Sequence, residues 1–72
     1  MAEKRTEAIL IGEKLKKLRT DNELSQDGIG KLLDCTGASW RLYELGLRIP
    51  NDKMKRKIAQ HFQKSIEELF FE

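Results

Sequence analysis

The side chains best equipped for chemistry lie between Thr36 and Arg48, where hydrogen-bond donors alternate with aromatic and aliphatic residues. This mixture suits recognition, because the planar guanidinium of Arg41 can pair with two acceptors at once and tryptophan is enriched in binding hot spots. No Ser/His/Asp set, phosphate-binding loop or metal-ligand spacing accompanies them in the sequence. The sequence therefore predicts a binding protein without catalytic residues, cofactor, metal or small-molecule substrate.

Two short helices separated by a tight turn are predicted to position these side chains. Ser25 and Thr36 are good N-caps for helices that end near residues 33 and 45. Asp34 stands where the turn needs a left-handed residue, a conformation that Asp tolerates better than most. A small residue at Gly30 would let the two helices approach closely. Residues 25–46 are thus expected to form a helix-turn-helix.

Three further helices are predicted around this motif, and no strand pattern is present. The first covers residues 1–20, the fourth opens at Pro50 and Asn51, and a capping box at Ser65 starts a short fifth. Their expected inner faces are apolar: Ala8, Ile11, Leu15 and Leu18 in the first helix, Met54, Ile58 and Phe62 in the fourth, and Leu69 and Phe70 in the fifth. The expectation is one all-α, five-helix domain over residues 1–72.

The charge distribution is modest for a protein that binds nucleic acid by itself. The net charge is +2, from 14 basic and 12 acidic residues. Within residues 25–46, Lys31 and Arg41 oppose Asp27, Asp34 and Glu44, which leaves −1. The remaining positive charge gathers in two groups, one with Lys14, Lys16, Lys17 and Arg19, the other with Arg48, Lys53, Lys55, Arg56 and Lys57. Each group is either a solvated helix face or a phosphate clamp beside a DNA groove.

Cysteine usage and hydropathy predict a protein of a reducing cytoplasm. The single cysteine, Cys35, cannot form an internal disulfide, and it follows an apolar run that favours a small buried side chain over a reactive thiol. The sequence has no membrane-spanning apolar run and no secretion signal.

Seven short motifs follow one another along most of the chain. They read KLR at 17–19, SQ at 25–26, KLL at 31–33, YELG at 43–46, RIP at 48–50, KIA at 57–59 and ELF at 68–70. In this order they resemble the Cro/repressor-type helix-turn-helix family, also called the XRE family. The resemblance implies a lambda-repressor-like, five-helix fold and binding to double-stranded operator DNA.

Carried over by position, the resemblance also implies the DNA contacts. Gln26 would touch a phosphate, Gly37, Ala38, Arg41 and Leu42 would face bases, and Ser39 and Arg48 would hold backbone phosphates. Glycine and alanine have no side-chain donor or acceptor, and Leu42 can only touch a thymine methyl, so Arg41 remains as the reader of guanine. One such pair discriminates by about 1–3 kcal/mol, short of the roughly 4–10 kcal/mol between specific and non-specific binding. Weak sequence reading is expected.

The chain is also similar in length and layout to modulators of repression, small regulators from the lytic side of temperate-phage switches. This similarity predicts an antirepressor in a bacterial host cell that binds the repressor of the same switch. The alternative is an autonomous, dimeric Cro-like repressor that binds operator DNA. The candidate partner contacts are acidic, aromatic or aliphatic: Asp27, Asp34, Trp40, Glu44, Ile9, Leu10 and Phe71.

Several of these residues have a structural alternative. Trp40 fits either the core or an exposed anchor, and Glu44 is explained by support of the fold as well as by partner binding. Ile9 and Leu10 form either a docking patch or a contact with the C-terminal segment. His61 is expected on the surface.

Overall fold

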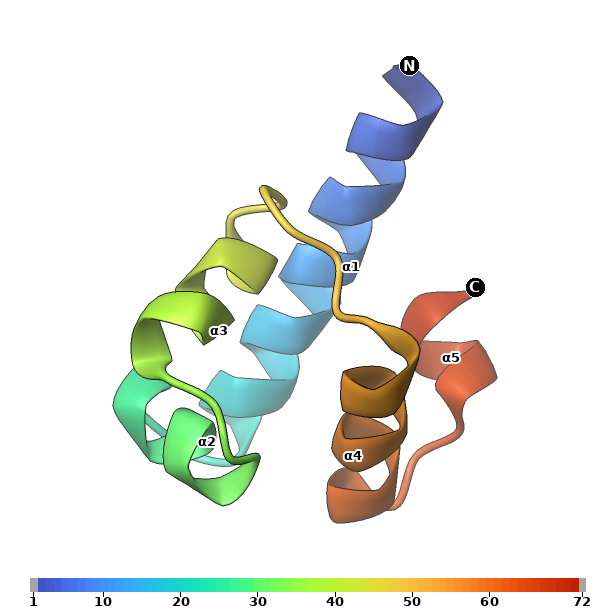
Figure 1. Ribbon diagram of the computed structural model, residues 1–72. Coiled ribbons are helices and arrows are strands. Elements are labelled where there is room, and N and C mark those ends of the chain that lie inside the picture. Colours follow the sequence, from blue (N-terminus) through green and yellow to red (C-terminus); the bar gives the residue numbers. More distant parts are fainter. Residues whose placement is uncertain (1, 72) are drawn as a thin grey trace.

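The computed structural model describes residues 2–71, with side chains from Thr6 to Phe71. All regular structure in this part is helical (Figure 1). The helices are α1 (Ala2–Asp21), α2 (Gln26–Leu32), α3 (Gly37–Glu44), α4 (Asp52–Phe62) and α5 (Ile66–Phe70). The predicted all-α class with five helices is therefore confirmed. The first helix was expected over residues 1–20, and of these Met1 lies outside the described residues.

Four helices begin at side-chain caps that the local sequence supplies. Ser25, Thr36, Asn51 and Ser65 each accept a hydrogen bond from a backbone N–H three residues later. At α5 the carboxylate of Glu68 also accepts from the N–H of Ser65 at 2.8 Å, which completes the predicted capping box. These bonds satisfy N–H groups that have no partner inside a helix.

Left-handed residues shape both ends of the chain segment around α3. Asp34 has a φ of 59° in the turn before α3, as the sequence predicts. Gly46, with a φ of 73°, ends the helix in a Schellman motif. In this motif the N–H of Gly46 donates to the carbonyl of Tyr43 at 3.1 Å, and that of Leu47 donates to Leu42 at 3.0 Å. The motif folds Leu47 back over the last turn of α3.

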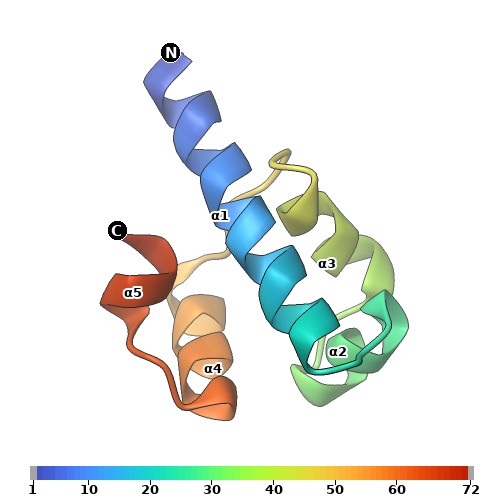
Figure 2. The same ribbon diagram turned by 180° about the vertical axis from the view of Figure 1, so that it is seen from behind.

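Helix α1 runs between the α2–α3 pair on one side and the α4–α5 pair on the other (Figures 1 and 2). The hydrophobic core lies where these helices meet α1. The predicted inner faces are confirmed, with Met54 and Phe62 partly buried against the core. The core cluster consists of Ile11, Leu15, Leu18, Ile29, Leu33, Trp40, Tyr43, Ile58, Ala59, Leu69 and Phe70.

Two glycines allow close approach of backbones around α3, Gly12 between α1 and α3 and Gly30 between α2 and the turn before α3. A Cβ on Gly12 would lie 2.5 Å from the carbonyl oxygen of Tyr43 and 2.6 Å from that of Glu44. A Cβ on Gly30 would lie 2.8 Å from the carbonyl oxygen of Cys35. All three distances are shorter than real contacts of a Cβ, so a side chain at either position would push the backbones apart. The close approach at Gly30 was predicted, whereas the role of Gly12 was not.

Candidate recognition surface

A buried ion pair holds α3 against α1. The Nε of Arg19 donates to Oε2 of Glu44 at 2.5 Å, and its Nη2 donates to Oε1 at 3.2 Å. The two side chains are only 14% and 4% exposed. The remaining guanidinium nitrogen donates to the carbonyl of Leu24 at 2.8 Å. A bidentate pair fixes orientation as well as distance, so it sets the C-terminal half of α3 relative to the end of α1.

Two more donors complete the shell of the Glu44 carboxylate. The indole Nε1 of Trp40 donates to Oε2 at 2.5 Å, and Nε2 of Gln26 donates to Oε1 at 3.1 Å. Burial opposes ionisation of this carboxylate, but hydrogen bonds from its three partners outweigh burial, so the pKa of Glu44 lies below its ordinary value. The hydrogen bond to Glu44 also raises the pKa of Arg19. This network joins α1, α2 and α3.

For two candidate partner contacts in this region, Trp40 and Glu44, the structural alternative is the one that the structure shows. Trp40 is not an exposed anchor, because its side chain is 0% exposed and packs edge to face with the ring of Tyr43. Glu44 supports the fold, and Arg19, a member of the first basic group, is its counter-ion and not a solvated side chain. The physical reason is shared: the indole N–H finds its acceptor in Glu44, and Glu44 finds its counter-ion in Arg19, so all three groups are buried together.

Gln26, the predicted phosphate contact, takes part in the same network. Its amide donates to Glu44 from the first residue of α2. The side chain is partly exposed, and the phosphate contact stays a prediction.

The outer face of α3, the side turned away from α1, begins with small side chains. Gly37 and Ala38 open the helix, and the hydroxyl of Ser39 accepts a hydrogen bond from that of Thr36 at 3.0 Å. The carboxylate of Asp27 lies over Gly37, in the space that a Cβ would need. The N-terminal end of the outer face therefore presents small residues and a negative charge.

The outer face of α3 ends in exposed aliphatic side chains. Leu42 and Leu45 are one helical turn apart, and the Schellman motif brings Leu47 back to the same end of the helix. The exposed fractions are 37% for Leu42, 51% for Leu45, 70% for Leu47 and 39% for Ile49, and these four residues are named the aliphatic strip.

Two exposed arginines belong to the same end of α3. Arg41 precedes Leu42 in the helix, and Arg48 stands in the chain between two members of the aliphatic strip. The outer face is thus polarised, with Asp27 at its N-terminal end and arginines at its C-terminal end. Lys31 is exposed on α2, and Asp34 is exposed in the turn between the two helices.

The remaining candidate contacts lie on different sides of the molecule. Ile9, 41% exposed, adjoins the aliphatic strip, because a Cβ on Gly46 would lie 2.9 Å from its Cγ1. Ile9 therefore lies beside the segment after α3. Leu10 is 53% exposed on α1. Phe71, 65% exposed, follows α5 on the opposite side of α1 from α3 (Figure 2), with the Lys55 ammonium 5.2 Å from its ring centre.

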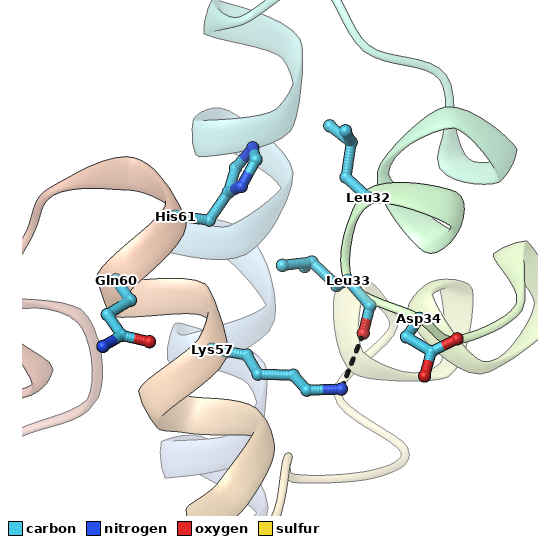
Figure 3. Close-up of a pocket in the computed structure, with 6 residues that line it drawn as sticks. All are labelled: Leu32, Leu33, Asp34, Lys57, Gln60 and His61. Carbon is cyan, nitrogen blue, oxygen red and sulfur yellow. Dashed lines mark hydrogen bonds between the residues drawn. The ribbon is translucent and has the colours of Figure 1, made fainter.

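An open groove of about 470 Å³ lies between the C-terminal end of α2 and α4 (Figure 3). Lys57 reaches across it and donates from Nζ to the carbonyl of Leu33 at 3.3 Å. This bond satisfies a carbonyl at the end of α2, so one member of the second basic group serves the fold. The groove is lined by Leu32, Leu33, Asp34, Lys57, Gln60 and His61.

The residues that could act as nucleophiles or metal ligands are not gathered in one site within the described part of the chain. Cys35 packs against the core, and burial raises the pKa of its thiol above the ordinary value. His61 is exposed, as predicted. Within the described residues, no group of three or more His, Cys, Asp or Glu side chains is arranged to hold a metal ion.

No protein-family model, curated protein or solved structure matches this chain. No helix in the part that the structure describes is long and apolar enough to cross a membrane.

Three members of the aliphatic strip, Leu45, Leu47 and Ile49, were not among the predicted site residues. The available signal was their position at and after the predicted end of α3, where they alternate with Gly46 and Arg48. The sequence alone does not tell whether these side chains pack inward, and their exposed fractions show that all three lie on the surface.

Proposed function

We propose that this chain is a small helix-turn-helix regulator with a lambda-repressor-like fold, which acts as an antirepressor by binding a partner repressor and binds DNA only weakly. The order of the five helices and the capped, tightly packed α2–α3 pair support the helix-turn-helix assignment. The seven motifs that resemble the XRE family support the same class.

The observation that carries the proposal is the aliphatic strip at the C-terminal end of α3. Four aliphatic side chains, each at least 37% exposed, lie on the last turn of the helix that would face DNA or directly after it. The DNA backbone is anionic and hydrated, and proteins bind it chiefly with cationic and polar groups. A cluster of exposed aliphatic residues instead marks a contact with another protein. The strip therefore favours a protein partner.

The N-terminal end of α3 supports the same conclusion. In a helix-turn-helix, the first residues of the recognition helix contact base edges. Here those residues are Gly37 and Ala38, and the Asp27 carboxylate beside them would repel phosphates. Arg41 alone reads at most about 1–3 kcal/mol of sequence preference.

A Cro-like repressor is the second candidate. Exposed Arg41 and Arg48 favour it, because both lie near α3 and carry donors suited to guanine or phosphate. This alternative needs a dimer, since operators present two related half-sites.

Fluorescence anisotropy distinguishes the two functions. A labelled duplex from the DNA upstream of the chain's own gene is titrated with this protein alone, and then with the protein after the neighbouring helix-turn-helix repressor has bound. We expect weak, salt-sensitive binding by the protein alone and release or supershift of the bound repressor. Leu47→Ser should abolish the effect on the repressor.

The matched control is Leu32→Ser, since Leu32 is also exposed but lies on α2 beside the groove. Tight, sequence-selective binding by the protein alone, lost in Arg41→Ala, would establish the Cro-like function instead.

A further inference from the structure

Three of the candidate partner contacts are acids, and none of these three borders the aliphatic strip. Glu44 is buried with Arg19. Asp27 lies over Gly37, at the other end of α3, and Asp34 stands in the turn where the groove begins. A partner that docks on the strip therefore meets none of these three carboxylates.

Two arginines, Arg41 and Arg48, are neighbours of strip residues in the sequence. Arg41 and Arg48 are both exposed, and neither guanidinium forms an ion pair with another described residue. A cationic partner surface, such as the DNA-binding face of a repressor, would be repelled by these arginines. Carboxylates placed around an apolar centre would be attracted to them.

The apolar centre is larger than α3 alone provides. Gly46 packs directly on α1, which sets Ile9 beside the end of α3. Leu42 in α3, Leu45 at its C-cap and Leu47 in the following turn add exposed apolar side chains in the same region. Anchors spaced along such a surface suit a helix with apolar residues at i, i+3, i+4 and i+7.

We propose that the aliphatic strip binds an acidic amphipathic helix of the partner protein, with aliphatic anchors on the strip and flanking carboxylates on Arg41 and Arg48. This proposal rests on the proposed function, because it specifies the partner surface that an antirepressor of this kind contacts. It places that surface outside the basic DNA-binding face of the partner.

Two labelled helical peptides test the proposal against the full chain. Both carry leucine at the same i, i+3, i+4 and i+7 positions, and they differ only in having glutamate or lysine at the flanking positions. Fluorescence anisotropy at low salt should show that the glutamate peptide binds at least about tenfold more tightly than the lysine peptide. Added salt should reduce this ratio.

Two pairs of variants locate the binding surface. Leu45→Ser should weaken the glutamate peptide at least about tenfold, whereas Leu32→Ser should not, although the two leucines are 51% and 49% exposed. Arg48→Glu should reverse the preference between the peptides. Lys64→Glu makes the same change in net charge at an exposed position after α4 and should leave the preference unchanged.

Other results would overturn the proposal. Tighter binding of the lysine peptide would show that the partner surface is basic. If the operator titration still shows release of the bound repressor, the proposed function stands and only the acidic partner helix is rejected. Failure of both peptides to bind, or equal weakening by Leu45→Ser and Leu32→Ser, would remove the strip as the docking surface. Failure of the proposed function has a separate signature, which is selective operator binding by the protein alone.

Discussion

The eight residues of α3 are divided between an inner face that is buried and hydrogen-bonded and an outer face that is exposed. On the inner face, Trp40 and Tyr43 are buried, and the carboxylate of Glu44 has a donor for each oxygen. On the outer face, Ala38 and Leu42 are exposed. The comparison shows that one short helix separates the groups that hold the fold from groups that are open to solvent.

This separation means that the outer side chains of α3 can change while the fold is kept. Substitutions at exposed positions usually change stability by no more than about 0.5 kcal/mol, whereas those that disturb a buried network cost several times more. The exposed side chains of the outer face can therefore change, and with them the ligand that this face binds. The inner face is not free to change.

The largest loss of stability is expected from removal of the Glu44 carboxylate. Glu44→Ala leaves Arg19 buried without its counter-ion and Trp40 without its acceptor, so the free energy of unfolding should fall by about 3–5 kcal/mol. Urea unfolding followed by circular dichroism measures this loss. Glu13→Ala, at an exposed position of α1, is the control and should change stability by no more than about 0.5 kcal/mol. Similar losses in both variants would contradict the view that the buried network of Glu44 contributes more to stability than an exposed carboxylate does.

A smaller loss of unfolding free energy is expected from a substitution at the contact between α3 and α1. Gly12→Ala should destabilise the protein by about 1–3 kcal/mol, because its Cβ would overlap the carbonyls of Tyr43 and Glu44, even though alanine is the better helix former. Thermal unfolding of Gly28→Ala provides the comparison. There a Cβ would approach only the side chains of Ser25 and Leu24, so stability should change by about 1 kcal/mol or less in either direction.

The inner face should also be sensitive to acid. The pKa of Glu44 is lower in the folded protein than its ordinary value of 4.5, so its ionisation stabilises the fold above that pH, and the contribution is lost as the pH falls through the folded pKa. Glu44→Gln lacks this contribution. The difference in unfolding free energy between wild type and Glu44→Gln should therefore shrink from pH 7 to pH 3, as measured by urea titration. A constant difference would show that the carboxylate does not titrate with folding.

The parts of the fold that were predictable depend on short stretches of sequence. Caps at Ser25 and Thr36, the left-handed Asp34 and the apolar faces of the helices are all encoded within a few residues. The close approach at Gly30 was also foreseen, because both helices of the motif were located in the sequence.

The parts that were missed depend on tertiary contacts. Arg19 and Glu44 are 25 residues apart, and within the sequence Arg19 is one more charge in a basic run. The same contact removes Glu44 and Trp40 from the candidate partner surface and explains why Gln26 turns toward the protein. The exposure of Leu47 likewise depends on how the chain leaves α3.

The smallest change in stability, and the sharpest test of the separation, is expected from Leu42→Arg. Leu42 is exposed, so the free energy of unfolding should stay within about 0.5 kcal/mol of wild type. The new guanidinium would lie on the outer face, where it adds a phosphate or guanine contact. Duplex affinity should rise about fivefold or more, and the slope of log K against log salt should steepen by about 0.9. Salt titrations by fluorescence anisotropy measure both quantities.

The control is Leu32→Arg, which adds the same charge at an exposed leucine of α2 that borders the groove. An equal gain in both variants would mean that net charge alone limits DNA binding, and the outer face of α3 would then have no special part in choosing the ligand. A gain confined to Leu42→Arg would mean that the frame still presents α3 to DNA, because the fold has to place the new side chain against the duplex for the slope to change. In that case the wild-type chain is kept from DNA by the side chains of the outer face and not by its architecture.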